Sequence, residues 1–459
     1  MEKVLSTIND IVWNPGLVVL LLLAGLYFSI RTRFLQVRRI GLMMRSLFGK
    51  KQGDQGMSSF QAFCLALSGR VGTGNIVGVA AAIASGGPGA IFWMWVVAFL
   101  GASTSFVEST LAQIYKFPHA SGYRGGPFSF IEHGLGKRWM GVVYAIVTIL
   151  SAGVFLVCVQ ANGVSSTLSN AFSVPPLATG IGMAVLMAVV IMGGVKRLAK
   201  VASVITPIMA FGYILMSLVV VFAHIQQVPA MLGLIVRSAF GMNPVLGGIL
   251  GSTISLGVRR GLFSNEAGQG TGAIVSASAD VPHPAQQGLA QGFSVYVDTL
   301  LVCTATALMI LTSGSYNVMD PSGAILVENA PALGANYTAF TQSAVDSVFP
   351  GFGGRFVSIA MLFFVFSTFL AYYFYAESSM LYLFRDRGSL KEKLNVRGLQ
   401  VVMLFSIVFG AAGEPNLTWK LGDIGSGIMT WMTVITILIL CPKALKSLKD
   451  YEQGLKIKK

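Results

Sequence analysis

Polar residues interrupt an apolar stretch in the first quarter of the chain. The sequence LSGRVGTGNIVG at 67–78 carries Arg70, Thr73 and Asn75 among its glycines. In a helix interior each glycine costs about 1 kcal/mol relative to alanine. Small residues there can serve close packing of membrane helices. Thr73 and Asn75 favour another interpretation, a helix that breaks at 72–75 and frees backbone groups to line a cavity or bind a ligand.

A second glycine-interrupted segment, GVRRGLFSNEAGQGTGAIVSAS, occupies 257–278. Within it, GTGAIV at 270–275 partly repeats GTGNIV at 72–77. About five predicted spans separate the starts of the two segments, and a five-helix unit repeated once has inverted topology. Paired interrupted helices in two inverted halves indicate a transporter site. Half-helix N-termini suit a carboxylate, and exposed carbonyl and hydroxyl oxygens suit Na⁺, so a zwitterionic amino acid fits between them.

A pair of hydroxyl side chains, Ser367 and Thr368, lies within the apolar sequence FFVFSTFLAYYFYAE at 363–377. A hydroxyl in a membrane helix ordinarily bonds to the preceding turn. An adjacent pair at mid-span is also compatible with coordination of a cation. Both interpretations stay open.

Ionisable residues also lie inside the apolar stretches, where they are costly and are usually paired or functional. Some could form internal ion pairs or face a water-filled vestibule. Arg70 is expected to be a gate or a structural charge, within reach of an acidic partner such as Glu266. The full set consists of Arg70, Glu108, Arg259, Arg260, Glu266, Asp298 and Glu377.

The chain that carries these residues is strongly apolar. Of its 459 residues, 54% are hydrophobic and 11% are charged, whereas soluble domains average about 25% charged residues. Apolar runs long enough to cross about 30 Å of hydrocarbon recur along the whole length. The predicted fold class is an all-α polytopic membrane protein with about eleven transmembrane helices. The predicted spans lie near 13–30, 60–84, 89–115, 139–166, 176–195, 201–223, 244–277, 287–312, 353–384, 397–412 and 421–441.

Basic residues are concentrated in alternate connections between these spans. Placing the basic connections in the cytoplasm puts the N-terminus outside and the C-terminus inside. An odd number of spans likewise puts the two termini on opposite sides of the membrane. The basic segments are 31–52, 137–138, 196–200, 385–393 and 443–459.

Two other connections, 117–136 and 313–350, are long and polar-aromatic. They predict either short surface or gating helices or plain loops.

Other function classes have little support in the sequence. The net charge of +14 follows from the basic loops, so nucleic-acid binding is disfavoured. No hydrolase, metalloprotease or nucleotide-binding motif is present, and an enzyme is therefore not expected. The four cysteines are too far apart for a metal site and are typical of small buried apolar residues: Cys64, Cys158, Cys303 and Cys441.

Two motifs, GGPGAIFWMWVVAFLG at 86–101 and GLFSNEAG at 261–268, resemble those of the alanine/glycine:cation symporter family, also called the sodium:alanine symporters. The similarity extends over essentially the full length. It implies a LeuT-type fold, with two inverted five-helix repeats after one extra N-terminal helix. The implied regions are an N-terminal helix and basic loop at 1–58, repeats at 59–225 and 226–442, and a basic cytoplasmic tail at 443–459.

The resemblance also implies a set of site residues. Gly74 and Asn75 match the small-Gly-Asn element of the first broken core helix, and the second break is expected within 263–270. The implied Na⁺ ligands are the carbonyls of Ser68, Val71 and Phe364 and the hydroxyls of Ser367 and Thr368. The implied substrate contacts are Thr73, Gly74, Asn75, Gln160, Phe263, Ser264, Asn265, Gly268 and Tyr372.

The resulting expectation is secondary active symport of alanine or glycine with Na⁺, without an organic cofactor, in the inner membrane of a prokaryote. The expected partners are the amino acid and membrane lipid, and the oligomeric state is open, a monomer being one option. The alternatives are an H⁺-coupled transporter, a transporter of glutamine or a D-amino acid, and a non-transporting membrane sensor or subunit.

Overall fold

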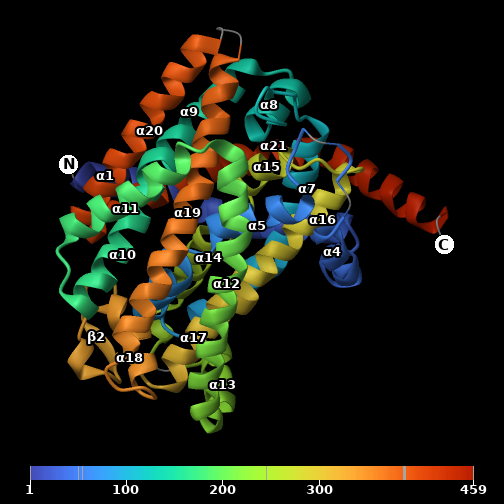
Figure 1. The fold of residues 1–459 in the computed structure, drawn as a ribbon. Helices are drawn as coiled ribbons and strands as arrows, with labels where there is room; N and C mark the ends of the chain where they lie inside the picture. The colour runs from blue at the N-terminus through green and yellow to red at the C-terminus, as the bar shows by residue number, and fades with distance from the viewer. Residues whose placement is uncertain (1, 50, 54, 244, 386–388, 458–459) are drawn as a thin grey trace.

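The computed structural model describes residues 2–49, 51–53, 55–243, 245–385 and 389–457. These form an almost entirely helical molecule with one small hairpin (Figure 1). The first half contains α1 Glu2–Val12, α2 Pro15–Arg31, α3 Leu35–Arg38, α4 Ile40–Leu47, α5 Ser59–Arg70, η1 Gly74–Gly78, α6 Val79–Gly86, α7 Gly89–Ile114, α8 Pro127–Leu135, α9 Arg138–Leu150, η2 Ser151–Phe155, α10 Leu156–Phe172, α11 Pro176–Ile191 and α12 Gly194–Ala223.

The second half begins with short helices and ends with three long ones. Its elements are η3 Ile225–Gln227, α13 Val228–Ala239, η4 Gly247–Ile249, α14 Leu250–Asn265, α15 Thr271–Ala277, α16 Pro284–Val295, η5 Tyr296–Cys303, α17 Thr304–Thr312, β1 Asn317–Met319, β2 Ile325–Glu328, η6 Pro331–Leu333, η7 Tyr337–Ala339, α18 Phe340–Asp346, α19 Gly353–Phe384, α20 Ser389–Ala412 and α21 Pro415–Ile457.

Within the described residues, eight helices are long and apolar enough to cross a membrane, and a bent pair makes a ninth. Two more predicted spans fall below that criterion. One is α11, which has 16 residues, and the other is the segment near 244–277, which is divided between α14 and α15. A multi-span helical protein is therefore confirmed, and the count of eleven stays a prediction.

The first predicted break is confirmed by the geometry of α5, η1 and α6. Ser58 caps the start of α5 in a capping box with Gln61. The helix ends at Arg70 because Val71 adopts an extended conformation, with φ −80° and ψ 94°. The two halves of the span are bent by 51°.

The second break is confirmed within the expected range and is built differently. Helix α14 ends at Asn265, and Glu266 takes a left-handed conformation with φ 55°. Gly268 and Gly270 follow with φ values of 93° and 86°. These three left-handed residues interrupt the helix before α15 begins.

The connections contain more regular structure than a plain loop. The segment 117–136 holds α8, and 313–350 holds α18, two 3₁₀ turns and the β1–β2 hairpin. The hairpin is antiparallel and pairs Asn317 with Glu328. The basic C-terminal region continues α21 as one helix that contains Pro442.

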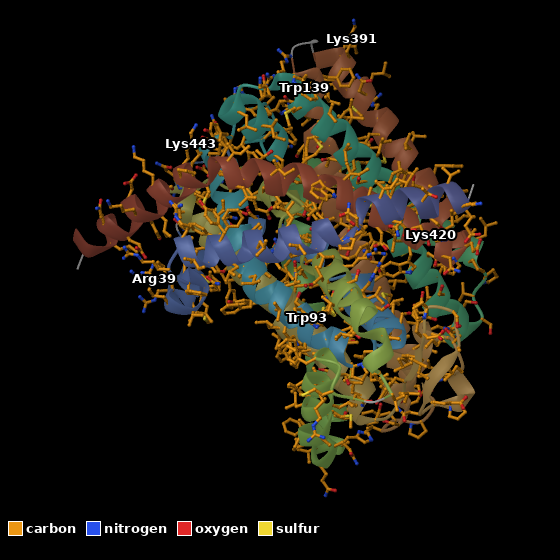
Figure 2. The ribbon with its side chains drawn as sticks, turned by 180° about the vertical axis from the view of Figure 1, so that it is seen from behind. Arg39, Trp93, Trp139, Lys391, Lys420 and Lys443 are labelled. Carbon is orange, nitrogen blue, oxygen red and sulfur yellow. The ribbon has the colours of Figure 1, made fainter. Side chains whose placement is uncertain are left out.

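The two broken helices lie inside the bundle. Helix α5 packs against α12, α16 and α19, and η1 packs against α14 and η5 (Figure 1). Figure 2, turned by 180°, shows α2 and α21 side by side across the opposite face, with Lys443 and Lys420 on α21. The backbone groups freed at the first break are therefore surrounded by other helices, whose side chains can reach them.

Candidate functional site

The carbonyl of Val71 meets a hydroxyl of α19 where the first broken helix ends. Thr368 Oγ1 lies 3.2 Å from the Val71 oxygen and 2.9 Å from the Phe364 oxygen. Ser367 Oγ donates to the same Phe364 oxygen at 2.9 Å. Ser68 lies one turn before the break, and its hydroxyl donates to Leu65 O at 2.8 Å. Ser68, Val71 and Thr368 are all buried, so these oxygens are held away from bulk water.

Gly72 separates this oxygen group from the next group of polar atoms. A Cβ atom on Gly72 would lie 2.6 Å from Gln160 Oε1 and 2.7 Å from Thr368 Oγ1. Any larger residue would collide with both side chains. The requirement for glycine at this position therefore comes from close approach on two sides.

Gln160, on α10, binds the first residue beyond Gly72. Its Oε1 accepts from the backbone N–H of Thr73 at 2.8 Å and from Thr73 Oγ1 at 2.9 Å. Its Nε2 lies 3.4 Å from Tyr372 Oη on α19. The structure therefore brings Thr73, Gln160 and Tyr372 together, as the sequence predicts.

Gly74 lies against α14, close to the second break. A Cβ atom there would lie 3.2 Å from Phe263 Cδ1 and 3.3 Å from Ser264 Cα. The Phe263 ring in turn packs on Trp419 of α21, with ring centroids 5.0 Å apart. Phe263 and Trp419 thus form an apolar wall beside the first break.

Asp298, in the π-helical segment η5, connects the two broken helices. Its Oδ1 accepts from Asn75 Nδ2 at 2.7 Å, and its Oδ2 accepts from Ser264 Oγ at 2.8 Å and Thr299 Oγ1 at 2.7 Å. Asn265 Nδ2 contacts Thr299 Oγ1 at 3.3 Å. In the sequence, Asp298 stands out as an intramembrane charge, but no pattern there indicates its partners.

Asn75 also bonds back to its own broken helix. The backbone N–H of Gly72 donates to Asn75 Oδ1 at 2.8 Å. This side chain therefore satisfies one amide that the break leaves without an intrahelical partner.

The second break is held by a carboxylate from α7. Glu108 Oε2 accepts from the backbone N–H groups of Gly268 and Gly270, at 3.2 and 3.1 Å. Tyr144 Oη donates to Gln269 O at 2.6 Å. The N–H of Gly268, a predicted substrate contact, is therefore engaged with Glu108 in this structure. The intramembrane position of Glu108 was the only sequence signal for its role.

Glu266 and Arg70 are both buried near this break but bond to different partners. Glu266 Oε2 accepts from Thr271 Oγ1 at 2.8 Å and from Tyr375 Oη at 3.2 Å. Arg70 donates to Gln291, Ser294 and Ser105. Arg70 was expected within reach of water or of an acidic partner such as Glu266, and the described residues show no ion pair between Arg70 and Glu266 within 4.0 Å. Arg70 reaches α16 and α7 instead.

Ion pairs lie on both sides of the two breaks. On the α14 side, Arg260 bonds to Asp423 of α21, and Arg259 lies 3.7 Å from the same carboxylate. On the other side, Arg124 lies 3.6 Å from Glu377 of α19. Burial lowers the pKa of Arg124, which lies in a connection, and the carboxylate of Glu377 opposes that shift.

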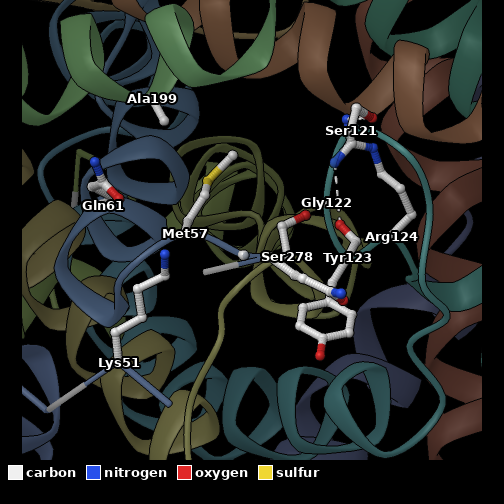
Figure 3. Close-up of a pocket in the computed structure, with 11 residues that line it drawn as sticks. Lys51, Met57, Gln61, Ser121, Gly122, Tyr123, Arg124, Ala199 and Ser278 are labelled. Carbon is white, nitrogen blue, oxygen red and sulfur yellow. Dashed lines mark hydrogen bonds between the residues drawn. The ribbon is translucent and has the colours of Figure 1, made fainter. Parts of the chain in front are cut away.

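A cavity of about 410 Å³ opens next to Arg124. Figure 3 shows Arg124 along one side of it, with Met57 and Ser278 among the other lining residues. A second cavity, of about 820 Å³, is lined by Glu377 and Gln400. The Arg124–Glu377 pair thus joins residues that border two cavities.

The chemistry of the donor set fits an alkali cation better than a transition metal. The described residues contain no group of three or more His, Cys, Asp or Glu side chains that could hold a metal ion. Around the first break the available ligands are neutral carbonyl and hydroxyl oxygens, which suit a hard cation. The adjacent backbone N–H groups suit a carboxylate.

Comparisons with known proteins bear on the family and the fold of the chain. The model of the sodium:alanine symporter family matches residues 1–459. YrbD of Bacillus subtilis (strain 168), named as a candidate sodium/proton-dependent alanine carrier protein, is 48% identical over 453 residues, covering 99% of this chain and 93% of YrbD. GlnT of the same organism, named as a candidate sodium/glutamine symporter, is 41% identical over 453 residues, covering 98% of this chain and 92% of GlnT.

Among solved structures, MhsT in complex with L-phenylalanine has a similar fold. The TM-score is 0.57 at 15% sequence identity, and the match covers 84% of this chain and 89% of MhsT. At that identity the likeness shows the fold alone. Because the family model matches the whole chain and relatives share over 40% of its residues, the chain belongs to the sodium:alanine symporter family, a family of transporters and not enzymes, and it is a multi-pass membrane protein of LeuT-type fold.

Proposed function

We propose that this protein takes up a small neutral amino acid, alanine or glycine, together with Na⁺ by secondary active symport. The observation that carries the proposal is the position of Gly72. On one side of it, the Val71 carbonyl meets Thr368 Oγ1 at 3.2 Å. On the other side, the Thr73 N–H meets Gln160 Oε1 at 2.8 Å. A single residue therefore joins a group of oxygens suited to a cation to an N–H group suited to a carboxylate.

In this proposal the Na⁺ ligands are the carbonyls of Ser68, Val71 and Phe364 and the hydroxyls of Ser367 and Thr368. Thr368 Oγ1 already lies within hydrogen-bond distance of the Val71 and Phe364 oxygens. An ion seated among these oxygens would fix the conformation of Val71. Since Val71 precedes Gly72 and Thr73, the bound ion would also order the carboxylate site, which couples the two ligands.

The proposed substrate site lies around the first break, opposite the second. The substrate carboxylate would meet the backbone at Thr73 and Gly74, with Asn75 and Gln160 nearby. Phe263 and Tyr372 would enclose the side chain of the substrate, and both are buried. Ser264, Asn265 and Gly268 complete the set from the second break. Bulky walls on two sides favour a small side chain.

The proposed architecture has eleven spans arranged as two inverted five-helix repeats after one N-terminal span. It includes α11 and the interrupted α14–α15 segment as membrane-crossing elements, with repeats at 59–225 and 226–442. The N-terminus would lie outside and the C-terminal region 443–459 in the cytoplasm, in the inner membrane of a prokaryote. The concentration of basic residues in alternate connections supports this orientation.

Alternating access would use the ion pairs on the two sides of the breaks. Arg260–Asp423 lies on the α14 side, and Arg124–Glu377 lies beyond α15, next to the cavity that Ser278 lines. Rocking of the broken-helix bundle against the remaining helices would open one pair while the other stays closed.

Uptake by proteoliposomes tests the proposal. Purified protein should accumulate labelled alanine under an inward Na⁺ gradient and should lose that accumulation when choline replaces Na⁺. Unlabelled glycine should compete, and larger neutral amino acids should compete less. Accumulation that ignores Na⁺ would contradict the ion assignment.

A second candidate function has the same fold but a different coupling ion or a different substrate. The names of YrbD and GlnT, which cite protons and glutamine, favour testing both. In the same vesicles, an inward pH gradient without Na⁺ tests proton coupling. Uptake of labelled glutamine tests whether the substrate site accepts a larger side chain.

A further inference from the structure

We propose that Glu108 and Glu266 form a proton-binding site beside Arg70, separate from the proposed Na⁺ ligands. Its role in transport rests on the proposed symport function. Proton binding itself is a property of these buried side chains and can be tested without transport.

The charges of the buried residues around the second break do not balance. Arg70 is 2% exposed, Glu266 is 1% exposed, and Glu108 and Asp298 are fully buried. These side chains carry one positive and three negative formal charges. A Na⁺ ion at the first break would offset one of the two excess negative charges. An uncompensated buried charge is costly, so the second excess negative charge requires another cation. A proton is the smallest such cation.

Each of the two glutamates has one satisfied oxygen and one bare oxygen. Glu108 Oε2 is bound by two backbone N–H groups and Glu266 Oε2 by two hydroxyls. Glu108 Oε1 and Glu266 Oε1 are buried without a hydrogen-bond partner. Protonation at a bare oxygen would remove the negative charge and leave the existing bonds to the other oxygen in place.

Arg70 lies close to Glu108 without neutralising it directly. A Cβ atom on Gly272 would lie 2.6 Å from Arg70 Nη2 and 3.6 Å from Glu108 Oε1, so both atoms border the space above that glycine. The guanidinium donates to oxygens of Gln291, Ser294 and Ser105, and its Nε has no partner. Arg70 thus supplies positive charge on one side of the site, while Glu108 Oε1 stays free to accept a proton.

The surrounding ionisable groups come from four directions. Arg70 faces the pair from α5, Asp298 from η5, Tyr144 from α9, and Tyr372 and Tyr375 from α19. Helix α16 contributes only neutral side chains such as Gln291. None of these neighbours is a second cation, so Arg70 is the only positive side chain in this described part of the site.

The proposed step is reversible protonation. A carboxylate oxygen of Glu108 or Glu266 accepts H⁺ and becomes a carboxylic acid, and the same O–H bond breaks when the proton is released to the other side. Glu266 is also the left-handed residue at the start of the second break. Its protonation state therefore bears on the hinge between α14 and α15.

Infrared spectroscopy on the purified protein tests proton binding directly. In a pH titration the wild type should show the carbonyl stretch of a buried protonated carboxyl group. Glu108→Gln or Glu266→Gln should remove that band, whereas Glu328→Gln, an exposed carboxylate in β2, should leave it unchanged. A titrating band present in all three variants, or absent from the wild type, would overturn the proposal.

Proton movement tests the role in transport. Proteoliposomes containing a trapped pH dye and clamped at zero membrane potential should acidify when alanine and Na⁺ are added outside. In Glu108→Gln and Glu266→Gln the acidification should fall to the level of protein-free liposomes. Alanine uptake with Na⁺ but without acidification in the wild type would reject the proton site and keep the symport proposal. Absence of any alanine uptake would reject the symport proposal, and the infrared titration would still decide proton binding.

Discussion

The two breaks expose similar backbone groups but satisfy them in different ways. At the first break the partners are neutral side chains, Asn75, Gln160 and Thr368. At the second, the Glu108 carboxylate binds two backbone N–H groups, and the chain passes through left-handed residues that require glycine at two positions.

This difference sets how readily each break can exchange a backbone partner for a ligand. A neutral amide or hydroxyl can exchange a backbone partner for a ligand at small net cost. A charge-assisted bond to a buried carboxylate is stronger, and leaving that carboxylate unpaired is costly. We therefore expect substitutions at Thr368 and Tyr372, beside the first break, to change chiefly ligand binding, and substitution of the left-handed Gly270 at the second to change chiefly stability.

Gly270→Ala should have the largest effect. Its added Cβ would lie 2.3 Å from Pro127 Cγ and 2.4 Å from Tyr144 Oη, at a φ of 86°. Backbone strain and overpacking together should lower the free energy of unfolding by about 2–4 kcal/mol. Thermal unfolding in detergent measures this. Gly314→Ala is the matched control, because Gly314 has a φ of 71° with nothing within 4 Å, and should cost only about 1 kcal/mol. Equal losses would show that packing at the second break is loose.

Thr368→Ala should have an intermediate effect, seen chiefly in the Na⁺ dependence of uptake. Loss of one hydroxyl ligand is worth about 1–2 kcal/mol, so the Na⁺ concentration for half-maximal alanine uptake should rise roughly tenfold. Ser379→Ala, on the same helix, removes a hydroxyl that bonds only to Tyr375 O and should leave the Na⁺ dependence unchanged. An unchanged Na⁺ dependence in Thr368→Ala would refute the proposed ion site.

Tyr372→Phe should have the smallest effect. Its hydroxyl contacts Gln160 at a long 3.4 Å, so the alanine concentration for half-maximal uptake should rise only about threefold. The control is Tyr213→Phe, which removes an equally buried hydroxyl that bonds to Thr306 rather than to a proposed substrate contact. The same shift in both variants would mean that Tyr372 has no special place near the substrate.

Much of the fold was predictable because its signals are local. Long apolar runs predicted the membrane helices, glycine beside polar residues predicted the break at 72–75, and the family resemblance implied the second break within 263–270. The β1–β2 hairpin in 313–350 and the continuation of α21 into the basic region as far as Ile457 were not predicted. Both depend on packing against other helices, and α21 contacts α1, α2, α7 and α10.

The site was predictable only in part. Thr73, Gln160 and Tyr372 lie together as expected. The resemblance supplied those positions, and no local sequence pattern would have joined α10 to α19. The partners of Asp298 and Glu108 were missed because a buried carboxylate in a sequence does not show which donors surround it.

The sequence by itself determined that the chain is a membrane transporter of known family and where its two helices break. Those properties follow from composition and from short motifs, since hydrophobic length and glycine content act on neighbouring residues. The tertiary structure decided which groups meet across the breaks. Thr368 reaches Val71 across 297 residues, and Glu108 reaches Gly268 across 160. Such contacts depend on the packing of whole helices, which brings together residues that no local pattern links.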